Sequence, residues 1–167
     1  MTDRLRVMVL ADTHLAPGSS RRLPDAVYWH LGQADVILHA GDLVAAEVLD
    51  DLGRFAPVHA VLGNNDHGLD DTLPETIEVT LAGVDVAMIH NSGPSKGRAA
   101  RMKRRFPSAR VVVFGHSHVP CDETGADGQR LFNPGSATWK RRAPRQTIGT
   151  WDVADGELVA HRLVPVD

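Results

Sequence analysis

The apolar pattern of the first 62 residues constrains the fold most, because two kinds of segment alternate there. Apolar runs at 5–10, broken only by Arg6, at 36–38 and at 58–62, which contains His59, are typical of strands that are buried on both faces. Between them, residues 21–32 carry apolar side chains at helical spacing and end at Gly32, and residues 45–55 predict a second helix. Strands that alternate with helices form parallel sheets with right-handed crossovers. The sequence therefore predicts an α/β fold.

The second half of the chain predicts more antiparallel pairing. Residues 77–81 and 84–89 flank the dipeptide Ala82-Gly83, which indicates a hairpin. A helix is expected over 95–106, and further strands over 110–114, 130–133, 146–153 and 157–163. Two mixed sheets packed face to face, with helices outside, accommodate both halves. The length of 167 residues predicts a single domain, 1–167.

Composition narrows the partners and the cellular compartment that we expect for this domain. Eighteen Lys and Arg against 21 Asp and Glu give a net charge of −3, which is no general signature of nucleic-acid or membrane attraction. No apolar run approaches the ~18 residues of a membrane span, and no signal peptide is recognised. One cysteine, Cys121, favours a reducing compartment. We therefore expect a cytoplasmic protein.

Side chains that can bind metals follow the predicted strands repeatedly. They are Asp12, His14, Asp42, Asn64, Asp66, His90, His116 and His118. Ligands bind beyond the carboxyl ends of parallel strands, so these loops should converge. In extended chain, residues i and i+2 point the same way. Asp12 with His14, and His116 with His118, are each expected to bind one centre.

The ligand types indicate two metal ions. Apart from Asp66, the set offers two carboxylates, one amide oxygen and four imidazoles. A single zinc ion takes about four ligands. Two adjacent divalent ions that share one carboxylate account for the whole set. Nitrogen and oxygen ligands without sulfur favour Mn, Fe, Ni, Co or Zn over Mg or Ca.

The order and spacing of these residues resemble the five motifs of the calcineurin-like metallophosphoesterases, over residues 7–136. The short NPGS segment that ends at Ser136 is similar to that of the compact bacterial and archaeal phosphodiesterase branch. This resemblance implies a four-layer α-β-β-α sandwich with a dinuclear metal site. It further implies one metal held by Asp12, His14, Asp42 and His118. The other is held by Asn64, His90, His116 and again Asp42, which bridges.

Two positions depart from the family pattern. Asn65 stands where most members carry a histidine that protonates the leaving group, and Asn91 follows His90 in place of the usual glycine. Asn65 is thus the candidate catalytic position beside the metals. The expected function is hydrolysis of a small phosphodiester by a hydroxide that bridges the two ions. Manganese is the first choice of metal.

Alternatives stay open at this point. They are a phosphomonoesterase, and a non-catalytic metal-binding scaffold like the retromer subunit that shares this fold. A basic run at 96–105 suggests nucleic-acid binding as a further alternative, but cations near a helix C-terminus are favoured by the helix dipole alone. Nucleic acid is therefore not an expected partner. A homo-oligomer remains open.

Three further features concern the surroundings of the predicted site. The basic cluster Lys140, Arg141, Arg142 and Arg145 would attract an anionic substrate if the NPGS segment borders the site. His39 is expected to be buried or to orient a ligand. His67 is a second candidate for the proton donor, although a surface role is favoured.

Overall fold

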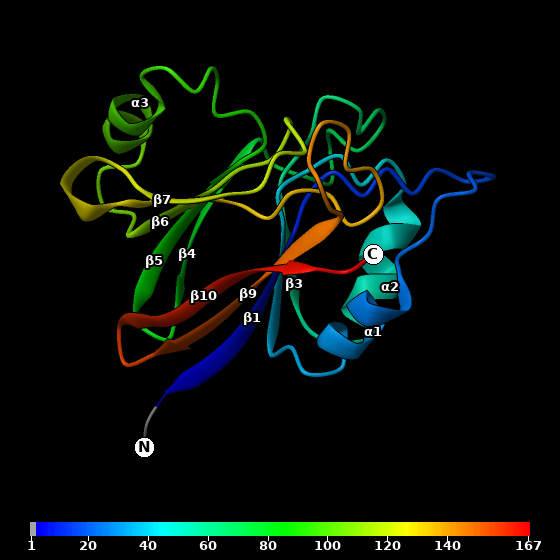
Figure 1. Ribbon diagram of the computed structural model, residues 1–167, viewed down its shortest axis with the longest axis horizontal. Helices are drawn as coiled ribbons and strands as arrows, with labels where there is room; N and C mark the ends of the chain where they lie inside the picture. Colours follow the sequence, from blue (N-terminus) through cyan, green and yellow to red (C-terminus); the bar gives the residue numbers. More distant parts are fainter. Residues whose placement is uncertain (1–2) are drawn as a thin grey trace.

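The computed structural model describes residues 3–167 and contains two five-stranded sheets (Figure 1). The first sheet has the order β10-β9-β1-β2-β3. Its strands are β1 (Arg4–Leu10), β2 (Val36–His39), β3 (Val58–Ala60), β9 (Thr147–Ala154) and β10 (Glu157–Pro165). β1, β2 and β3 pair in parallel, whereas β9 and β10 add an antiparallel extension on the other side of β1.

The second sheet is also mixed and has the order β4-β5-β6-β8-β7. Its strands are β4 (Thr76–Leu81), β5 (Val84–Ile89), β6 (Val111–Val113), β7 (Cys121–Thr124) and β8 (Arg130–Asn133). The predicted hairpin is confirmed, because β4 and β5 pair in antiparallel register from Thr76 opposite Ile89 to Leu81 opposite Val84. β5, β6 and β8 are parallel neighbours.

The three predicted helices are present but shorter than expected. They are α1 (Asp25–Leu31), α2 (Ala46–Gly53) and α3 (Arg98–Arg105), with a 3-10 turn, η1 (Ala126–Gly128), before β8. α1 begins after Pro24, because a residue that precedes proline is kept out of the helical region. α3 begins after Gly97, whose φ is 76°. No helix within residues 3–167 has the length and apolar character to cross a membrane.

One strand was not predicted. Cys121 lies in β7, an edge strand that pairs antiparallel with β8. β7 has the sequence CDET, and none of its side chains is fully buried. A short, polar edge strand carries no apolar alternation, so the sequence offers no signal for it.

Three apolar clusters separate the four layers of the sandwich. β1 shows how, because Val7 and Val9 pack between the sheets whereas Met8 and Leu10 pack beneath α1 and α2. The cluster between the sheets also holds Trp151, Phe132, Val111 and Val86. A third cluster under α3 contains Met102, Phe106, Phe114 and Leu131. The predicted four-layer α-β-β-α sandwich is confirmed.

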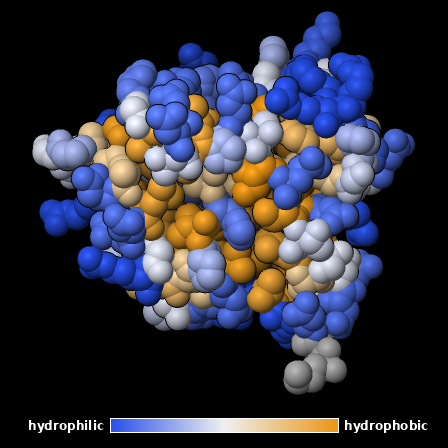
Figure 2. Space-filling model, turned by 180° about the vertical axis from the view of Figure 1, so that it is seen from behind, coloured by the Kyte–Doolittle hydropathy of each residue, from blue (hydrophilic) through white to orange (hydrophobic). Residues whose placement is uncertain are grey.

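The rear face of the molecule exposes apolar side chains. Apolar side chains form a band across the middle of this face, with hydrophilic residues around it (Figure 2). β3 and β4 are edge strands, and each pairs with a neighbour on one side only. At one rim of the sandwich, the loops that follow the parallel strands come together above both sheets (Figure 1). This rim positions the candidate site.

Candidate metal centre

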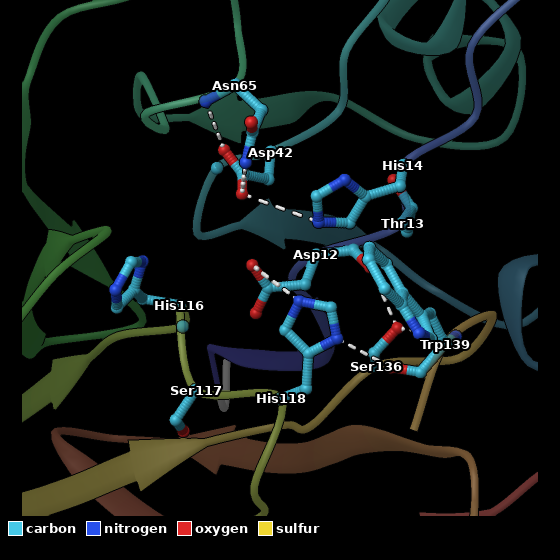
Figure 3. A network of polar contacts seen from close by, with 12 residues as sticks. Asp12, Thr13, His14, Asp42, Asn65, His116, Ser117, His118, Ser136 and Trp139 are labelled. Carbon is cyan, nitrogen blue, oxygen red and sulfur yellow. Dashed lines mark hydrogen bonds and ion pairs between the residues drawn. The ribbon is translucent and has the colours of Figure 1, made fainter. Parts of the chain in front are cut away.

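The predicted ligands lie where five strands of the two sheets end. Asp12 and His14 follow β1, Asp42 follows β2, Asn64 follows β3, His90 follows β5, and His116 and His118 follow β6. Figure 3 shows the side chains of Asp12, His14, Asp42 and His118 close together, with His116 further off. The seven ligands predicted from the sequence therefore come to one rim of the sandwich.

Two overlapping groups of ligand atoms could each hold a metal ion. One comprises Asp12, His14 and His118, and the other Asp12, Asp42 and His90; within each group the ligand atoms lie within 4.8 Å of one another. The two groups share Asp12, whose Oδ1 is 3.7 Å from His118 Nε2 and 3.9 Å from His90 Nε2. Two ion positions side by side are thus geometrically available.

Asp42 also lies between the two sets of imidazoles. Its Oδ2 is 3.4 Å from His14 Nε2 and 3.5 Å from His90 Nε2. The family resemblance implies that Asp42 is the shared carboxylate, and this geometry is compatible with that role. Both carboxylates, rather than Asp42 alone, reach ligands on either side.

Buried polar atoms without partners show that the centre suits a metal. Both oxygens of Asp12 and the Nε2 atoms of His14 and His118 are buried and make no hydrogen bond. Buried polar groups are otherwise almost always paired. Carboxylate oxygens and imidazole nitrogens are ligands that transition metals accept. The donor set therefore fits divalent ions.

The remaining nitrogens of two imidazoles are held by the backbone. His118 Nδ1 donates to the carbonyl of Trp139 at 2.5 Å, and His90 Nδ1 donates to that of Ala40 at 2.7 Å. Such bonds fix the tautomer and the ring orientation of metal-binding histidines. In both residues they leave Nε2 directed at the carboxylates.

Asn64 and His116 lie at the exposed rim of the centre. Asn64 Oδ1 accepts hydrogen bonds from His90 Nε2 at 2.9 Å and from His116 Nδ1 at 3.1 Å. His116 is thereby on the His90 side, away from the group that contains His118. Which ion His116 binds stays a prediction.

The backbone at five of the seven ligands is left-handed. The φ angles are 54° at Asp12, 44° at His14, 60° at Asp42, 71° at His116 and 63° at His118. The extended chain assumed for the two i, i+2 pairs is therefore absent. Positive φ is uncommon for residues other than glycine, and such strain clusters at functional sites.

Burial dominates the electrostatics around Asp12. It raises the pKa of Asp12 to about 7, although the charge of His90 opposes this. It lowers the pKa of His118 to about 4 and moves the pKa of His14 below its usual value. Neutral imidazole is the form of histidine that binds metals. His14 and His118 are thus held in the form needed.

Asp42 and His90 are shifted in the opposite sense. Burial acts to raise the pKa of Asp42, but hydrogen bonds from His90 and Asn65 outweigh it and hold the pKa below its usual range. Burial acts to lower the pKa of His90, yet Asp42 and Asp12 raise it above its usual value. His90 donates from Nδ1 to the carbonyl of Ala40 and from Nε2 to Asn64 Oδ1. A metal would replace the proton on Nε2.

Asn65 contacts Asp42 through both of its nitrogen donors. Its side-chain Nδ2 donates to Asp42 Oδ2 at 2.8 Å, and its backbone N–H donates to Oδ1 at 2.8 Å. Figure 3 shows the amide turned onto this carboxylate. The arrangement orients Asp42. His67, the second candidate for a proton donor, is an exposed side chain.

Asp66, the last acidic residue of its motif, fixes the backbone around the centre. Its Oδ2 accepts from the backbone N–H groups of Asp42 at 2.9 Å and Gly63 at 2.7 Å. Its Oδ1 accepts from Val44 at 2.7 Å. Asp66 therefore joins the loop after β2 to the loop after β3.

Two glycines make room for ligands. A β-carbon at Gly63 would lie 2.2 Å from Asp42 Oδ1, and one at Gly41, where φ is 94°, would lie 2.7 Å from His90 Nδ1. Neither position accepts a larger side chain without displacing a ligand.

His39 supports the loop after β1, as expected from the sequence. It is fully buried, and burial lowers its pKa to about 3. Its Nδ1 accepts from the backbone N–H of Gly41 at 3.2 Å, so Nε2 carries the proton and donates to Thr13 Oγ1 at 3.0 Å. His39 thus holds Thr13, between Asp12 and His14, in place.

The segment 136–139 borders the centre, and sequence reasoning did not identify its role. Ser136 Oγ donates to the carbonyl of Asp12 at 2.8 Å, and Thr138 Oγ1 donates to that of Thr13 at 2.6 Å. Trp139 lies edge-on to His14 and His118 with ring centroids 5.2 Å apart in each case. The NPGS motif was the one available signal.

Comparisons with known proteins agree with this geometry. The model of the calcineurin-like phosphoesterase superfamily domain matches residues 5–156. A probable metallophosphoesterase of Methanothermobacter thermautotrophicus is 32% identical over 135 residues, which cover 80% of this chain and 77% of that protein. Another from Methanocaldococcus jannaschii is 34% identical over 163 residues, which cover 95% and 80%.

Solved structures share the whole fold. A Thermotoga maritima protein is 26% identical, with a TM-score of 0.74 over 96% of this chain and 99% of that one. Entamoeba histolytica Vps29 in complex with zinc is 22% identical, with a TM-score of 0.72 over 98% and 100%. The phosphoesterase YfcE of Escherichia coli is 21% identical, with a TM-score of 0.60 over the same shares. The last two likenesses concern the fold alone.

The match to the family model spans the candidate metal centre and most of both sheets, and both archaeal relatives are probable metallophosphoesterases. The resemblance found in the sequence motifs is confirmed. The chain belongs to the calcineurin-like phosphoesterase superfamily.

Proposed function

We propose that this protein is a phosphodiesterase that works with two divalent metal ions. One ion is held by Asp12, His14, Asp42 and His118, and the other by Asp42, Asn64, His90 and His116. The observation that carries the proposal is the pair of overlapping ligand groups, in which buried atoms of Asp12, His14 and His118 have no partner among residues 3–167.

Manganese is the metal that we propose first, with Fe, Ni, Co and Zn as further candidates. Four imidazoles favour these ions over Mg²⁺, which prefers oxygen ligands. When bound, such a pair of ions lowers the pKa of a coordinated water molecule and neutralises charge on phosphoryl oxygens. The protein itself supplies no convincing nucleophile. Its side chains hold the ligands and shape the surroundings.

A groove beside the ligands gives room for a substrate. It has a volume of about 320 Å³ and is lined by Asn64, His90, Asn91, Glu75 and Arg105 among others. The proposed ligands Asn64 and His90 line it, and the exposed Arg105 adds a positive charge that suits an anionic ester and offsets the negative charge of Glu75. A small phosphoester is therefore the proposed substrate.

The preference for diesters follows from the residue at position 65. An amide is no proton donor to a leaving group, and the nitrogen donors of Asn65 are already engaged by Asp42. General-acid catalysis contributes about 10²–10⁴-fold for basic leaving groups. The protein should therefore favour esters with acidic leaving groups. A diester also carries one negative charge fewer than a monoester dianion.

The test compares matched esters in metal-depleted protein to which one metal at a time is returned. We expect Mn²⁺ to restore hydrolysis of bis(p-nitrophenyl) phosphate, with a kcat/KM above that for p-nitrophenyl phosphate. Asn65→His should raise the monoester share. A preference for the monoester would indicate a phosphomonoesterase. No hydrolysis with any metal would support a non-catalytic scaffold.

The proposed location is the cytoplasm. The one cysteine of the chain, Cys121, is a free thiol, which suits a reducing compartment.

A further inference from the structure

Trp139 lies between the candidate metal centre and solvent. Its backbone is fixed on both sides, because its N–H donates to Ser136 Oγ at 2.9 Å and its carbonyl accepts from His118 Nδ1. The indole ring lies against the imidazoles of His14 and His118 (Figure 3). Even so, 37% of the residue remains exposed. Whatever binds at the centre from this side meets Trp139.

Two arginines from distant segments stack on this indole. The guanidinium carbon of Arg21, from the loop before α1, lies 4.1 Å from the ring centroid. That of Arg141 lies 4.5 Å from it. Cations are attracted to the face of tryptophan at such distances. Through Trp139, both positive charges are held within about 10 Å of His14 and His118, roughly one Debye length at 0.1 M salt.

These two guanidinium groups have no anionic partner in the part of the chain that the structure describes. Some other arginines are held by partners: Arg130 pairs with Asp122, Arg145 pairs with Asp167, and Arg101 donates to three backbone carbonyls. Arg21 and Arg141 make no ion pair or side-chain hydrogen bond within residues 3–167. Two guanidinium groups stacked on one indole, with their donors unused, are suited to binding an anion beside that ring.

We propose that Arg21, Trp139 and Arg141 form an anion clamp that binds a second phosphate group of the substrate. The clamp rests on the proposed function and narrows its substrate class to phosphoesters that carry another phosphate within about 10 Å of the scissile one. A guanidinium binds phosphate oxygens through two parallel hydrogen bonds. Two guanidinium groups together offer two such pairs of hydrogen bonds. A phosphate has enough oxygens to accept both pairs, whereas the two oxygens of a carboxylate accept only one pair.

The first test measures anion binding without metals or hydrolysis. Pyrophosphate is titrated into protein that has been freed of metals on a chelating resin, and binding is followed by calorimetry and by tryptophan fluorescence. We expect saturable binding that changes the emission. Arg21→Ala and Arg141→Ala should each weaken it by about tenfold to a hundredfold, as expected for loss of a charge-assisted hydrogen bond. Trp139→Phe should remove the change in emission.

The neighbouring arginines provide matched controls. Arg22 and Arg142 are exposed, carry the same charge and adjoin the clamp residues, but they do not stack on Trp139. Arg22→Ala and Arg142→Ala should keep pyrophosphate affinity within about twofold, because screened surface charges contribute little. Absence of saturable binding, or equal losses in clamp and control variants, would overturn the proposal.

The second test separates the clamp from the proposed function. The Mn²⁺-loaded protein is given bis(p-nitrophenyl) phosphate and a p-nitrophenyl nucleoside 5′-phosphate that bears a 3′-phosphate. Arg141→Ala should lower kcat/KM at least tenfold more for the second ester than for the first. Equal losses for both esters would refute the clamp and leave the phosphodiesterase standing. Hydrolysis of neither ester by the wild type would refute the phosphodiesterase, while pyrophosphate binding would still decide the clamp.

Discussion

Replacing Gly63 by alanine should disable the metal centre through a single methyl group. The added β-carbon would lie 2.2 Å from Oδ1 and 2.3 Å from the backbone nitrogen of Asp42. Carbon contacts are comfortable at about 3.5 Å, so Asp42 must move by about 1 Å. A misplacement of about 1 Å costs roughly 10²-fold in rate. Overpacking of this kind costs about 1–3 kcal/mol in unfolding free energy.

Three measurements on one preparation check this prediction. Urea unfolding gives the stability, plasma mass spectrometry gives the bound metal, and bis(p-nitrophenyl) phosphate gives kcat/KM. Gly53→Ala is the control, because Gly53 ends α2 and an added β-carbon there meets nothing within 4 Å. The control should be neutral or stabilised by up to about 1 kcal/mol. A Gly63→Ala protein with normal metal content and activity would refute the close approach of Gly63 to Asp42.

Three further predictions concern the ligands, the core and the thiol. Asp42→Asn should reduce bound metal toward one ion or none and abolish hydrolysis, as measured by plasma mass spectrometry and ester assay. Phe132→Ala should lower the unfolding free energy by about 3–5 kcal/mol in urea titrations, because Phe132 is fully buried against Trp151 between the sheets. Burial raises the pKa of Cys121 to about 11, so iodoacetamide should alkylate the native protein at pH 8 far more slowly than the unfolded chain.

The sheets could be predicted because burial on two faces leaves a clear trace in the sequence. β1 must be apolar at Val7 and Val9 for the other sheet and at Met8 and Leu10 for the helices. The polar residues that follow such runs then stand out. The convergence of the seven predicted ligands followed from parallel topology. Their roles as ligands remain predictions.

The rest depends on contacts that local sequence does not encode. Ser136 and Asp12 are 124 positions apart, and the residues near each of them do not predict their hydrogen bond. Arg21 and Arg141 meet on Trp139 only through the fold. The left-handed backbone of Asp12 likewise has no periodic signature, because it is imposed by the surrounding loops.

We propose that two divalent ions lie side by side at the rim of the sandwich. Anomalous diffraction from crystals grown with saturating Mn²⁺ tests it most directly. We expect two manganese peaks, one against His14 and His118 and one against His90, with Asp42 touching both. A single peak, or manganese bound elsewhere with these side chains unliganded, would contradict it.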